Sequence, residues 1–417
     1  MIHRKMRYTY VGVDSHKETH CAVFLDCFFE KLGEITFENL PSKFGGFLEL
    51  AQKYKSEGTV FLFGLEDISS YGRTLTVFLK ANGQKVKHVN AQLVASERKN
   101  QTIVQKTDSV DAECAARVLL SKFSALPDAD TQDIYWVMRS LVARRNFLVK
   151  NRAAAKKQLH SFVTQHYPNY RQFFEGIDSA TALAFFTRYP SPILLKGTTA
   201  PELTAFLQDT GKGNYTLETA QRILATLEDT TIQYQEFRDT VVKSTIRQIR
   251  FNIEEIEQLE EAMEVFLKKF DCTLTSMTGI DTVTAARMLA YIGDIKKFST
   301  PAKLARYAGI APVTYASGKK DLQFANQRGN RQLNALFYQL AVRLCYATGS
   351  SRKVMNSFFF DYYNRKLSEG KTKHQALKCA QRRLINIIWT MLTRGEEYVN
   401  PPLYDLPEDE EADAQTV

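Results

Sequence analysis

The chain has 417 residues, long enough for two or three domains. Its 55 lysines and arginines exceed its 46 aspartates and glutamates, giving a formal net charge of +9 and indicating a polyanionic partner. Six scattered cysteines without paired metal-ligand spacing exclude a zinc ribbon, and no apolar run approaches the roughly 18 residues of a membrane span. With no signal-peptide core at the N-terminus, we expect a soluble, cytoplasmic protein that does not contact a membrane.

The first part of the chain predicts three strands joined by short polar turns. Residues 8–13 form an apolar, β-branched run, and residues 20–26 and 34–39 alternate apolar and polar side chains. Residues 44–54 have helical spacing. Residues 59–67 form a continuous apolar run that is typical of a strand buried on both faces.

A helix over residues 71–83, closed by a glycine, and a fifth strand over residues 84–91 complete the order β-β-β-α-β-α-β. This order, followed by helices, is the ribonuclease-H-like arrangement, a mixed α/β sheet in which the first and fourth strands are neighbours. Asp14 and Glu66 stand at the ends of those two strands, so we expect them to converge.

Two further carboxylates begin the next predicted helix, residues 106–120. Asp108 and Asp111 are three residues apart and therefore share one helix face. Converging carboxylates repel one another unless a cation neutralises them, and hard oxygen ligands select Mg²⁺ or Mn²⁺. Two such ions can stabilise the attacking and leaving oxygens of a phosphodiester displacement.

Simpler interpretations of these residues remain open. Asp108 alone is a suitable helix N-cap, although capping leaves Asp111 without a role. Asp67 competes with its neighbour for the metal site, but in an extended strand it points to the opposite face. We do not expect the close pair His16 and His20 to bind a metal.

Residues 134–174 contain no acidic residue and predict a phosphate-binding helical surface, unless their charges are simply solvated. The cations of this segment are Arg139, Arg144, Arg145, Lys150, Arg152, Lys156, Lys157 and Arg171. Residues 295–353 repeat the pattern, with Asp321 as their only acid.

The middle of the chain predicts a long helix. Between Val242 and Phe270 the apolar residues step by three and four, and Glu260 interrupts one core position. This spacing fits a coiled coil that forms a dimer, and it fits a monomeric bundle as well. Residues 190–213, rich in proline and glycine, predict an irregular connection or a small insert.

The C-terminal part is predicted to be mainly helical. Gly279-Ile280-Asp281 opens a helix in the manner of a helix-hairpin-helix, and residues 300–312 offer a second such element. Ser317 follows, and it can attack phosphorus only if its proton is removed and the developing charge is neutralised. Four cations near it are candidate phosphate contacts: Lys319, Lys320, Arg328 and Arg331. Alternatively, Ser317 is an ordinary turn serine.

Several segments together resemble the DEDD-type transposases of the insertion-sequence one-ten family. They are VGVDSHK at 11–17, LEDISSYGRTL at 65–75, HVNA at 88–91, KTDSVDA at 106–112, MTGIDTVTAARMLAYIGDIKKF at 277–298, LARYAGIAP at 304–312, SGK from Ser317 and QRGNRQLN from Gln327. The stretches at 67–70 and 324–326 depart from the usual family pattern.

The resemblance implies a RuvC-like domain over residues 1–127 and a C-terminal transposase domain over residues 273–400. Between them, residues 128–272 would form a basic helical and coiled-coil region with an insert. We expect residues 401–417 to be an acidic, disordered tail.

The resemblance also implies roles for residues and partners. Asp14, Glu66, Asp108 and Asp111 would bind Mg²⁺ or Mn²⁺, and Ser317 would form a covalent phosphoserine link to DNA. The partners would be donor and target DNA and a structured noncoding bridge RNA that pairs with both. The protein would act as a dimer or tetramer.

Three other functions remain open on the sequence. A site-specific DNA invertase of the pilin-inversion type shares these motifs. A RuvC-like junction nuclease would need the carboxylates alone, with Ser317 structural. A non-catalytic nucleic-acid clamp would need neither the carboxylates nor the hydroxyl of Ser317.

Overall fold

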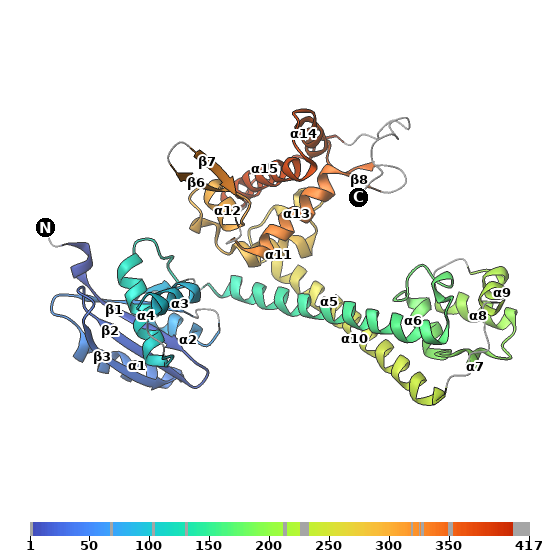
Figure 1. Ribbon diagram of the computed structural model, residues 1–417, viewed down its shortest axis with the longest axis horizontal. Coiled ribbons are helices and arrows are strands. Elements are labelled where there is room, and N and C mark those ends of the chain that lie inside the picture. The colour runs from blue at the N-terminus through green and yellow to red at the C-terminus, as the bar shows by residue number, and fades with distance from the viewer. Residues whose placement is uncertain are drawn as a thin grey trace. The chain divides into compact units, whose positions relative to one another are not determined.

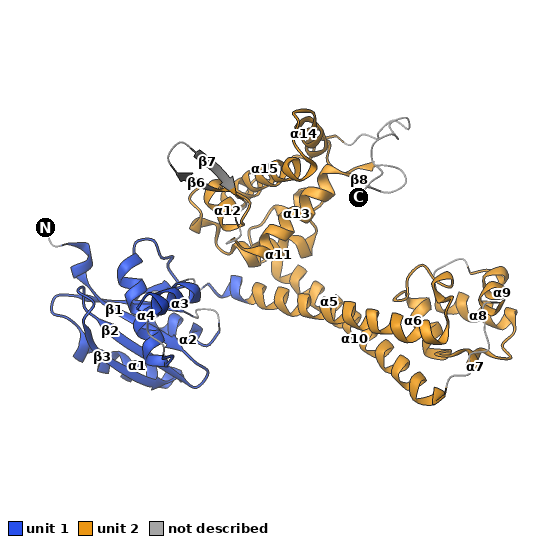
Figure 2. Ribbon diagram, in the orientation of Figure 1, with its two compact units in different colours: residues 1–136 blue, residues 137–417 orange. Residues whose placement is uncertain are grey.

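The protein is described by a computed structural model over residues 3–66, 70–101, 105–129, 132–211, 215–225, 233–317, 320–324, 326, 329–348 and 353–402. It contains two compact units, Met1–Trp136 and Val137–Val417, shown in different colours in Figure 2. Helices and strands are labelled as in Figure 1.

The first unit is built on a five-stranded mixed sheet with the order β3-β2-β1-β4-β5. Its strands are β1 (Tyr8–Ser15), β2 (Thr19–Leu25), β3 (Lys31–Glu38), β4 (Val60–Leu65) and β5 (Lys85–His88). The first three form an antiparallel meander, while β4 lies parallel to β1 and β5 parallel to β4. The prediction that the first and fourth strands are neighbours is therefore confirmed, and the arrangement is compatible with a RuvC-like domain.

Successive side chains of β1 point to opposite faces of the sheet and enter two different cores. Helices therefore cover both faces. Val11 and Val13 pack on the side of α1 (Pro41–Ala51) and α2 (Arg73–Ala81). Tyr10 packs on the opposite side, against the core that includes α3 (Ala91–Asn100) and α4 (Asp108–Lys122). Short 3-10 turns occupy Arg4–Arg7 and Gln52–Tyr54.

Helix α4 approaches β1 most closely at Gly12. A Cβ atom added to Gly12 would lie 2.1 Å from the carbonyl oxygen of Ala112 and 2.3 Å from the backbone nitrogen of Ala116. Asp14 lies two residues further along the strand and so on the same face, toward α4. The close packing at Gly12 thereby fixes the first turn of α4 beside the end of β1.

The second unit contains two long antiparallel helices, α10 (Gln235–Leu267) and α5 (Asp133–His166), of which α5 starts four residues before the unit does. Arg145 of α5 forms an ion pair with Glu260 of α10 at 2.6 Å, so the acid that interrupts the apolar repeat pairs within the chain. The apolar stripe of α10 is buried against α5, in one core with Leu159 and Val163. The repeat thus has an intramolecular partner, and dimerisation through it stays a prediction.

Between these long helices the chain forms a helical insert. It consists of α6 (Ala180–Arg188), α7 (Pro192–Leu195), α8 (Ala200–Thr210) and α9 (Leu217–Ala225), after a 3-10 turn at Tyr170–Gln172. The expectation of an irregular connection over residues 190–213 is wrong as far as residue 210, because Pro192 and Pro201 begin helices instead of interrupting them. Residues 192–195 and 200–210 are instead helices of the helical insert.

The C-terminal part of the second unit packs its helices around one core. The helices are α11 (Thr282–Ile292), α12 (Pro301–Tyr307), α13 (Arg331–Cys345), α14 (Ser357–Ser368) and α15 (Lys373–Arg394), with 3-10 turns at Leu274–Ser276 and Ile295–Lys297. Two short antiparallel hairpins join them: β6 (Val313–Ser317) with β7 (Lys320–Phe324), and β8 (Ala347–Thr348) with β9 (Lys353–Val354). The prediction of a mainly helical region is confirmed.

The turns predicted to begin and end helices in this part are present. Asp281 caps α11 through the backbone nitrogen of Thr284, and Gly279 before it has a positive φ of 90°. Gly309 follows the end of α12, also with a positive φ. The acidic residues of the C-terminal tail lie outside the described residues. Within the described part of the chain, no helix has the length and apolarity needed to cross a membrane.

The packing at Gly12 gives the first prediction. Gly12→Ala is expected to destabilise the first unit by about 2 kcal/mol, because the added methyl group meets helix backbone and not a flexible side chain. Hydrogen–deuterium exchange of the segments that form β1 and α4 would report the loss of protection. Gly45→Ala in α1 is the matched control, since no atom lies within 4 Å of its added Cβ. Equal protection in the two variants would contradict the close α4–β1 contact.

Candidate metal and serine sites

Three side chains of the first unit converge at the end of β1. Nε2 of His16 lies 3.0 Å from a carboxylate oxygen of Asp14 and 3.3 Å from one of Asp108. Each of the three side chains offers one candidate metal-ligand atom, and these atoms all lie within 4.8 Å of one another. Among the described residues, this is the only such group of three or more histidines, cysteines and acids. Two of the four predicted carboxylates are therefore brought together.

The local structure explains this convergence. Asp14 is the seventh residue of β1, and its side chain is only 15% exposed. Asp108 is the first residue of α4. The helix is capped by Thr107, whose hydroxyl accepts a hydrogen bond from the backbone nitrogen of Val110 at 3.3 Å. The alternative that Asp108 is the N-cap is wrong, which leaves its carboxylate available beside Asp14.

The other two predicted ligands lie outside this three-residue cluster. Asp111 is on the next turn of α4 and forms an ion pair with Arg98 of α3. Its charge still acts on Asp14, whose pKa it raises. Glu66 directly follows β4, whose last residue Leu65 pairs with Val13, so Glu66 and Asp14 each come one residue after that last parallel pair. A metal role for Asp111 and Glu66 stays a prediction.

The electrostatics of the cluster are those of crowded carboxylates. Burial raises the pKa of Asp14, and the charges of Asp111 and Asp108 raise it further, while His16 opposes them. Partial burial lowers the pKa of His16, but Asp14 and Asp108 outweigh this effect and raise the pKa above its usual range. The site therefore favours added positive charge.

The residues present fit a divalent cation. Two carboxylates supply the hard oxygen ligands that Mg²⁺ and Mn²⁺ prefer, and their oxygens lie within 4.8 Å of each other and of a ring nitrogen of His16. The imidazole of His16 is a ligand type that transition metals accept more readily than Mg²⁺. Asp14 and Asp108 would hold such an ion, with His16 beside them.

His16 was not expected to bind a metal, yet its imidazole lies in one cluster with Asp14 and Asp108. The turn from β1 to β2 folds back at this residue, where its backbone nitrogen donates to the carbonyl oxygen of Thr19 at 3.0 Å. The available signal was the spacing Asp14-x-His16 at a strand end. His20 behaves as expected for a structural residue, since it is fully buried against the rings of Phe37 and Phe44.

In the second unit, Ser317 ends strand β6 and pairs in register with Lys320 at the start of β7. The serine therefore stands at the tip of a tight hairpin, which agrees with its predicted place beside a turn. Gly318, Lys319 and Arg328 lie outside the described residues, as do the side chains of Ser317 and Lys320. Arg331 is exposed at the first position of α13.

The segment that follows this hairpin is held against α12 by hydrogen bonds to backbone carbonyl oxygens of that helix. The side-chain amide of Asn326 donates to the carbonyl oxygen of Arg306 at 3.1 Å, and the backbone nitrogen of Asn330 donates to that of Tyr307 at 2.7 Å. A Cβ on Gly329 would lie 2.2 Å from the Cα of Gly309. Two of the motif segments are thus packed together, and they fix the base of the serine hairpin.

The cations of the predicted basic surface, seven on α5 and Arg171 in the 3-10 turn after it, divide into two groups. Arg145 pairs with Glu260, and Lys156 and Arg152 pair with Asp178 at 2.6 and 3.7 Å. Arg139 donates to the carbonyl oxygen of Ala290. The exposed group comprises Arg144, whose guanidinium lies over the ring of Phe147, and Lys150, Lys157 and Arg171. Nucleic-acid binding by these cations stays a prediction.

Comparisons with known proteins match two separate ranges of the chain. Residues 11–168 match a family model described as transposase, that of the DEDD transposases of IS110 elements. Residues 272–355 match the model of the transposase IS116/IS110/IS902 family. The carboxylate cluster lies in the first matched range and the serine hairpin in the second.

Individual relatives extend over most of the chain. The 44.8 kDa protein of insertion element IS116 from Streptomyces clavuligerus is 26% identical over 92% of this chain and 94% of its own length. The 42 kDa protein of insertion element IS900 from Mycobacterium paratuberculosis is 24% identical over 92% and 95%. The transposase for insertion sequence element IS1328 from Yersinia enterocolitica is 24% identical over 75% and 78%.

The geometry of the cluster gives the second prediction. Asp14→Asn and Asp108→Asn are each expected to weaken Mn²⁺ binding by at least about tenfold, because each removes a negative ligand from the same site. Electron paramagnetic resonance of free Mn²⁺ during a titration of the full chain measures this directly. Glu18→Gln removes an exposed acid four residues from Asp14 and should leave the affinity unchanged. Unchanged affinity in both aspartate variants would place the ion elsewhere.

Proposed function

Because the chain belongs to the IS110 family of transposases, and so is a DNA-recombining enzyme, we propose that it cuts and rejoins DNA through a covalent phosphoserine link at Ser317, assisted by a divalent cation held at Asp14 and Asp108. The observation that carries the proposal is the pairing of two chemically distinct sites in one chain. A cation-attracting carboxylate cluster lies within residues 11–168, and a serine at a hairpin tip lies within residues 272–355.

The strand-transfer step forms one phosphorus–oxygen bond for each one that it breaks. Oγ of Ser317 forms a bond to the scissile phosphorus while the bond from phosphorus to one ester oxygen of the DNA breaks, and the departing oxygen receives a proton. Attack by the hydroxyl group of another strand reverses the step, restores a phosphodiester and frees the serine. Because one phosphate ester replaces another at each stage, the reaction needs no ATP.

The residues of the chain have separable tasks in this scheme. A divalent cation, when bound, would neutralise charge on the phosphoryl oxygens. Asp14 and Asp108 hold positive charge at the end of β1, and the packing at Gly12 keeps their backbones rigid. The contacts of Asn326 and Asn330 with α12 fix the base of the serine hairpin.

The choice of DNA sequence is part of the proposal. We assign it to a structured bridge RNA that pairs with donor and target DNA, with the protein acting as a dimer or tetramer. The family resemblance supports this assignment. Exposed cations on α5 support it as well: Arg144, Lys150 and Lys157. Such side chains suit contacts with phosphate backbones, which do not carry sequence information.

A trapping experiment tests the role of Ser317. Wild-type protein incubated with bridge RNA, Mg²⁺ and radiolabelled donor and target DNA should give a protein–DNA adduct that survives denaturation. Ser317→Ala should reduce the adduct to background, because no other atom replaces the attacking oxygen. Denaturing gel electrophoresis followed by mass spectrometry of the linked peptide provides the measurement.

The control and the contrary outcomes are distinct. Ser299→Ala removes an exposed serine elsewhere in the same domain and should leave the adduct intact. An adduct that persists in Ser317→Ala would overturn the serine assignment. DNA cleavage that continues in Ser317→Ala without any adduct would instead favour a RuvC-like nuclease that uses the carboxylates alone.

A further inference from the structure

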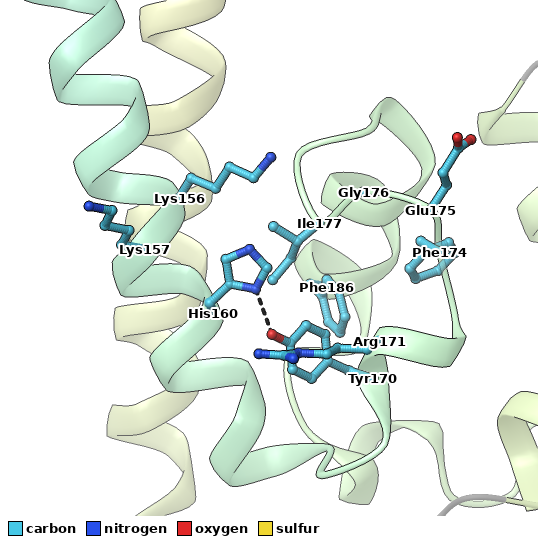
Figure 3. Close-up of a pocket in the computed structure, with 10 residues that line it drawn as sticks. All are labelled: Lys156, Lys157, His160, Tyr170, Arg171, Phe174, Glu175, Gly176, Ile177 and Phe186. Carbon is cyan, nitrogen blue, oxygen red and sulfur yellow. Dashed lines mark hydrogen bonds between the residues drawn. The ribbon is translucent and has the colours of Figure 1, made fainter. Parts of the chain in front are cut away.

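The helical insert and α5 enclose a cavity of about 500 Å³ that the proposed function does not use. It is lined by Lys156 and His160 of α5, by Tyr170 and Arg171 of the 3-10 turn that follows, and by Phe174 and Phe186 of the insert (Figure 3). Four of these residues lie beyond residue 168 and before residue 272, outside both ranges that match family models. The size of the cavity is in the range of small-ligand sites.

The cavity is preformed by a packed core. Tyr170 and Phe186 are buried, and Phe186 shares one hydrophobic core with Leu159 of α5 and Val242 of α10. The Tyr170 hydroxyl lies 2.5 Å from Nδ1 of His160, which holds the imidazole ring in place. The walls therefore need little rearrangement to receive a ligand, which reduces the entropic cost of binding.

Aromatic rings form much of the wall. The ring centroids of His160 and Tyr170 are 5.7 Å apart, and those of Phe174 and Phe186 are 5.9 Å apart in an edge-to-face arrangement. His160 and Phe174 are only half-buried, so part of each ring faces the cavity. Half-buried rings of this kind suit stacking with a flat aromatic ligand.

Two cations flank the ring of His160, and the one acid among the lining residues, Glu175, points its carboxylate away from that ring in Figure 3. In Figure 3 the imidazole of His160 lies between the side chain of Lys156 and the guanidinium of Arg171. Burial lowers the pKa of His160, and Lys156 and Arg171 lower it further, against a smaller opposing effect of Asp178. Asp178 is paired with Lys156, whereas no carboxylate of the described chain lies within ion-pair distance of the exposed Arg171. An anionic group is therefore favoured beside Arg171.

We propose that this cavity binds one unpaired nucleotide of a nucleic-acid strand, with its base stacked on His160 or Phe174 and its phosphate bound by Arg171. The combination of flat rings and an exposed guanidinium matches the two parts of a nucleotide. Duplex nucleic acid keeps its bases stacked inside and cannot present one to a cavity of this size, so the site selects single strands, loops or bulges. The proposal rests on the family's DNA substrate for the presence of nucleic acid, and not on the chemistry of Ser317.

Binding of short single strands to the full chain tests the proposal. Fluorescence anisotropy would compare a labelled oligouridine RNA, an oligothymidine DNA and a blunt DNA duplex of the same length. Arg171→Gln is expected to weaken single-strand binding by about tenfold, through loss of a charged hydrogen bond. Phe174→Leu is expected to weaken it by about fivefold or more, through loss of a stacking face. Duplex binding should hardly change in Phe174→Leu.

A matched variant separates the cavity from general electrostatics. Arg222→Gln removes the same charge from α9, an exposed position of the same insert away from the cavity, and should weaken single-strand binding by about twofold at most. Thermal unfolding followed by circular dichroism would verify that the variants remain folded. Equal losses in Arg171→Gln and Arg222→Gln would overturn the proposal.

Cross-linking locates the bound nucleotide and identifies the strand. A single 4-thiouridine or 4-thiothymidine in the oligonucleotide should cross-link to the peptide containing His160 or Phe174. An effect in the RNA arm alone would assign an RNA loop to the site, and an effect in the DNA arm alone would assign an extruded DNA base. Cross-links exclusively outside the cavity would overturn the proposal. If the trapping experiment showed no adduct at Ser317, these differences in binding affinity would still be expected. The two proposals can therefore fail independently of each other.

Discussion

The contact between α4 and β1 at Gly12 is the constraint on which the candidate metal site depends. Because Gly12 lacks a side chain, the backbone of α4 lies against the strand, and Asp108 is held near Asp14. Two carboxylate charges within 4.8 Å of each other repel by on the order of 3 kcal/mol at an effective dielectric constant of about 20. The repulsion is smaller where solvent reaches Asp108. The fold imposes this repulsion, and positive charge relieves it, whether carried by His16 or by a bound cation.

Much of the first unit could be predicted because its signals are local. The apolar runs, Gly83 and the three-residue spacing of Asp108 and Asp111 correctly gave the order of the elements and their neighbours in the sheet. The capping residue and the ligand set were harder to predict. Thr107 and Asp108 are both good caps, and only the backbone geometry selects the first. The partner of Asp111 is Arg98 of another helix, which no spacing rule identifies.

The charge on α5 shows why a local sequence pattern is an incomplete guide to a surface. The helix contains only one acid, at its first position, yet Glu260 and Asp178 reach it from elsewhere in the chain and pair with Arg145 and Lys156. These two cations stabilise the contacts of α5 with α10 and with the insert. The charge that remains for a polyanion is smaller than the sequence indicates, and it is concentrated at residues such as Lys150 and Lys157 that face solvent.

The motifs around the serine owe part of their specificity to packing. Gly309 and Gly329 belong to two of the segments that carry the family resemblance, and a side chain on Gly329 would overlap the backbone of Gly309. The hydrogen bonds of Asn326, Asn330 and Asn334 with the end of α12 depend on the same close approach. A nucleophile at the tip of a short hairpin can be positioned only if the base of that hairpin is fixed. The glycines and asparagines of these motifs meet that requirement, so chains that share them are expected to share the geometry of the hairpin base before any shared chemistry is considered.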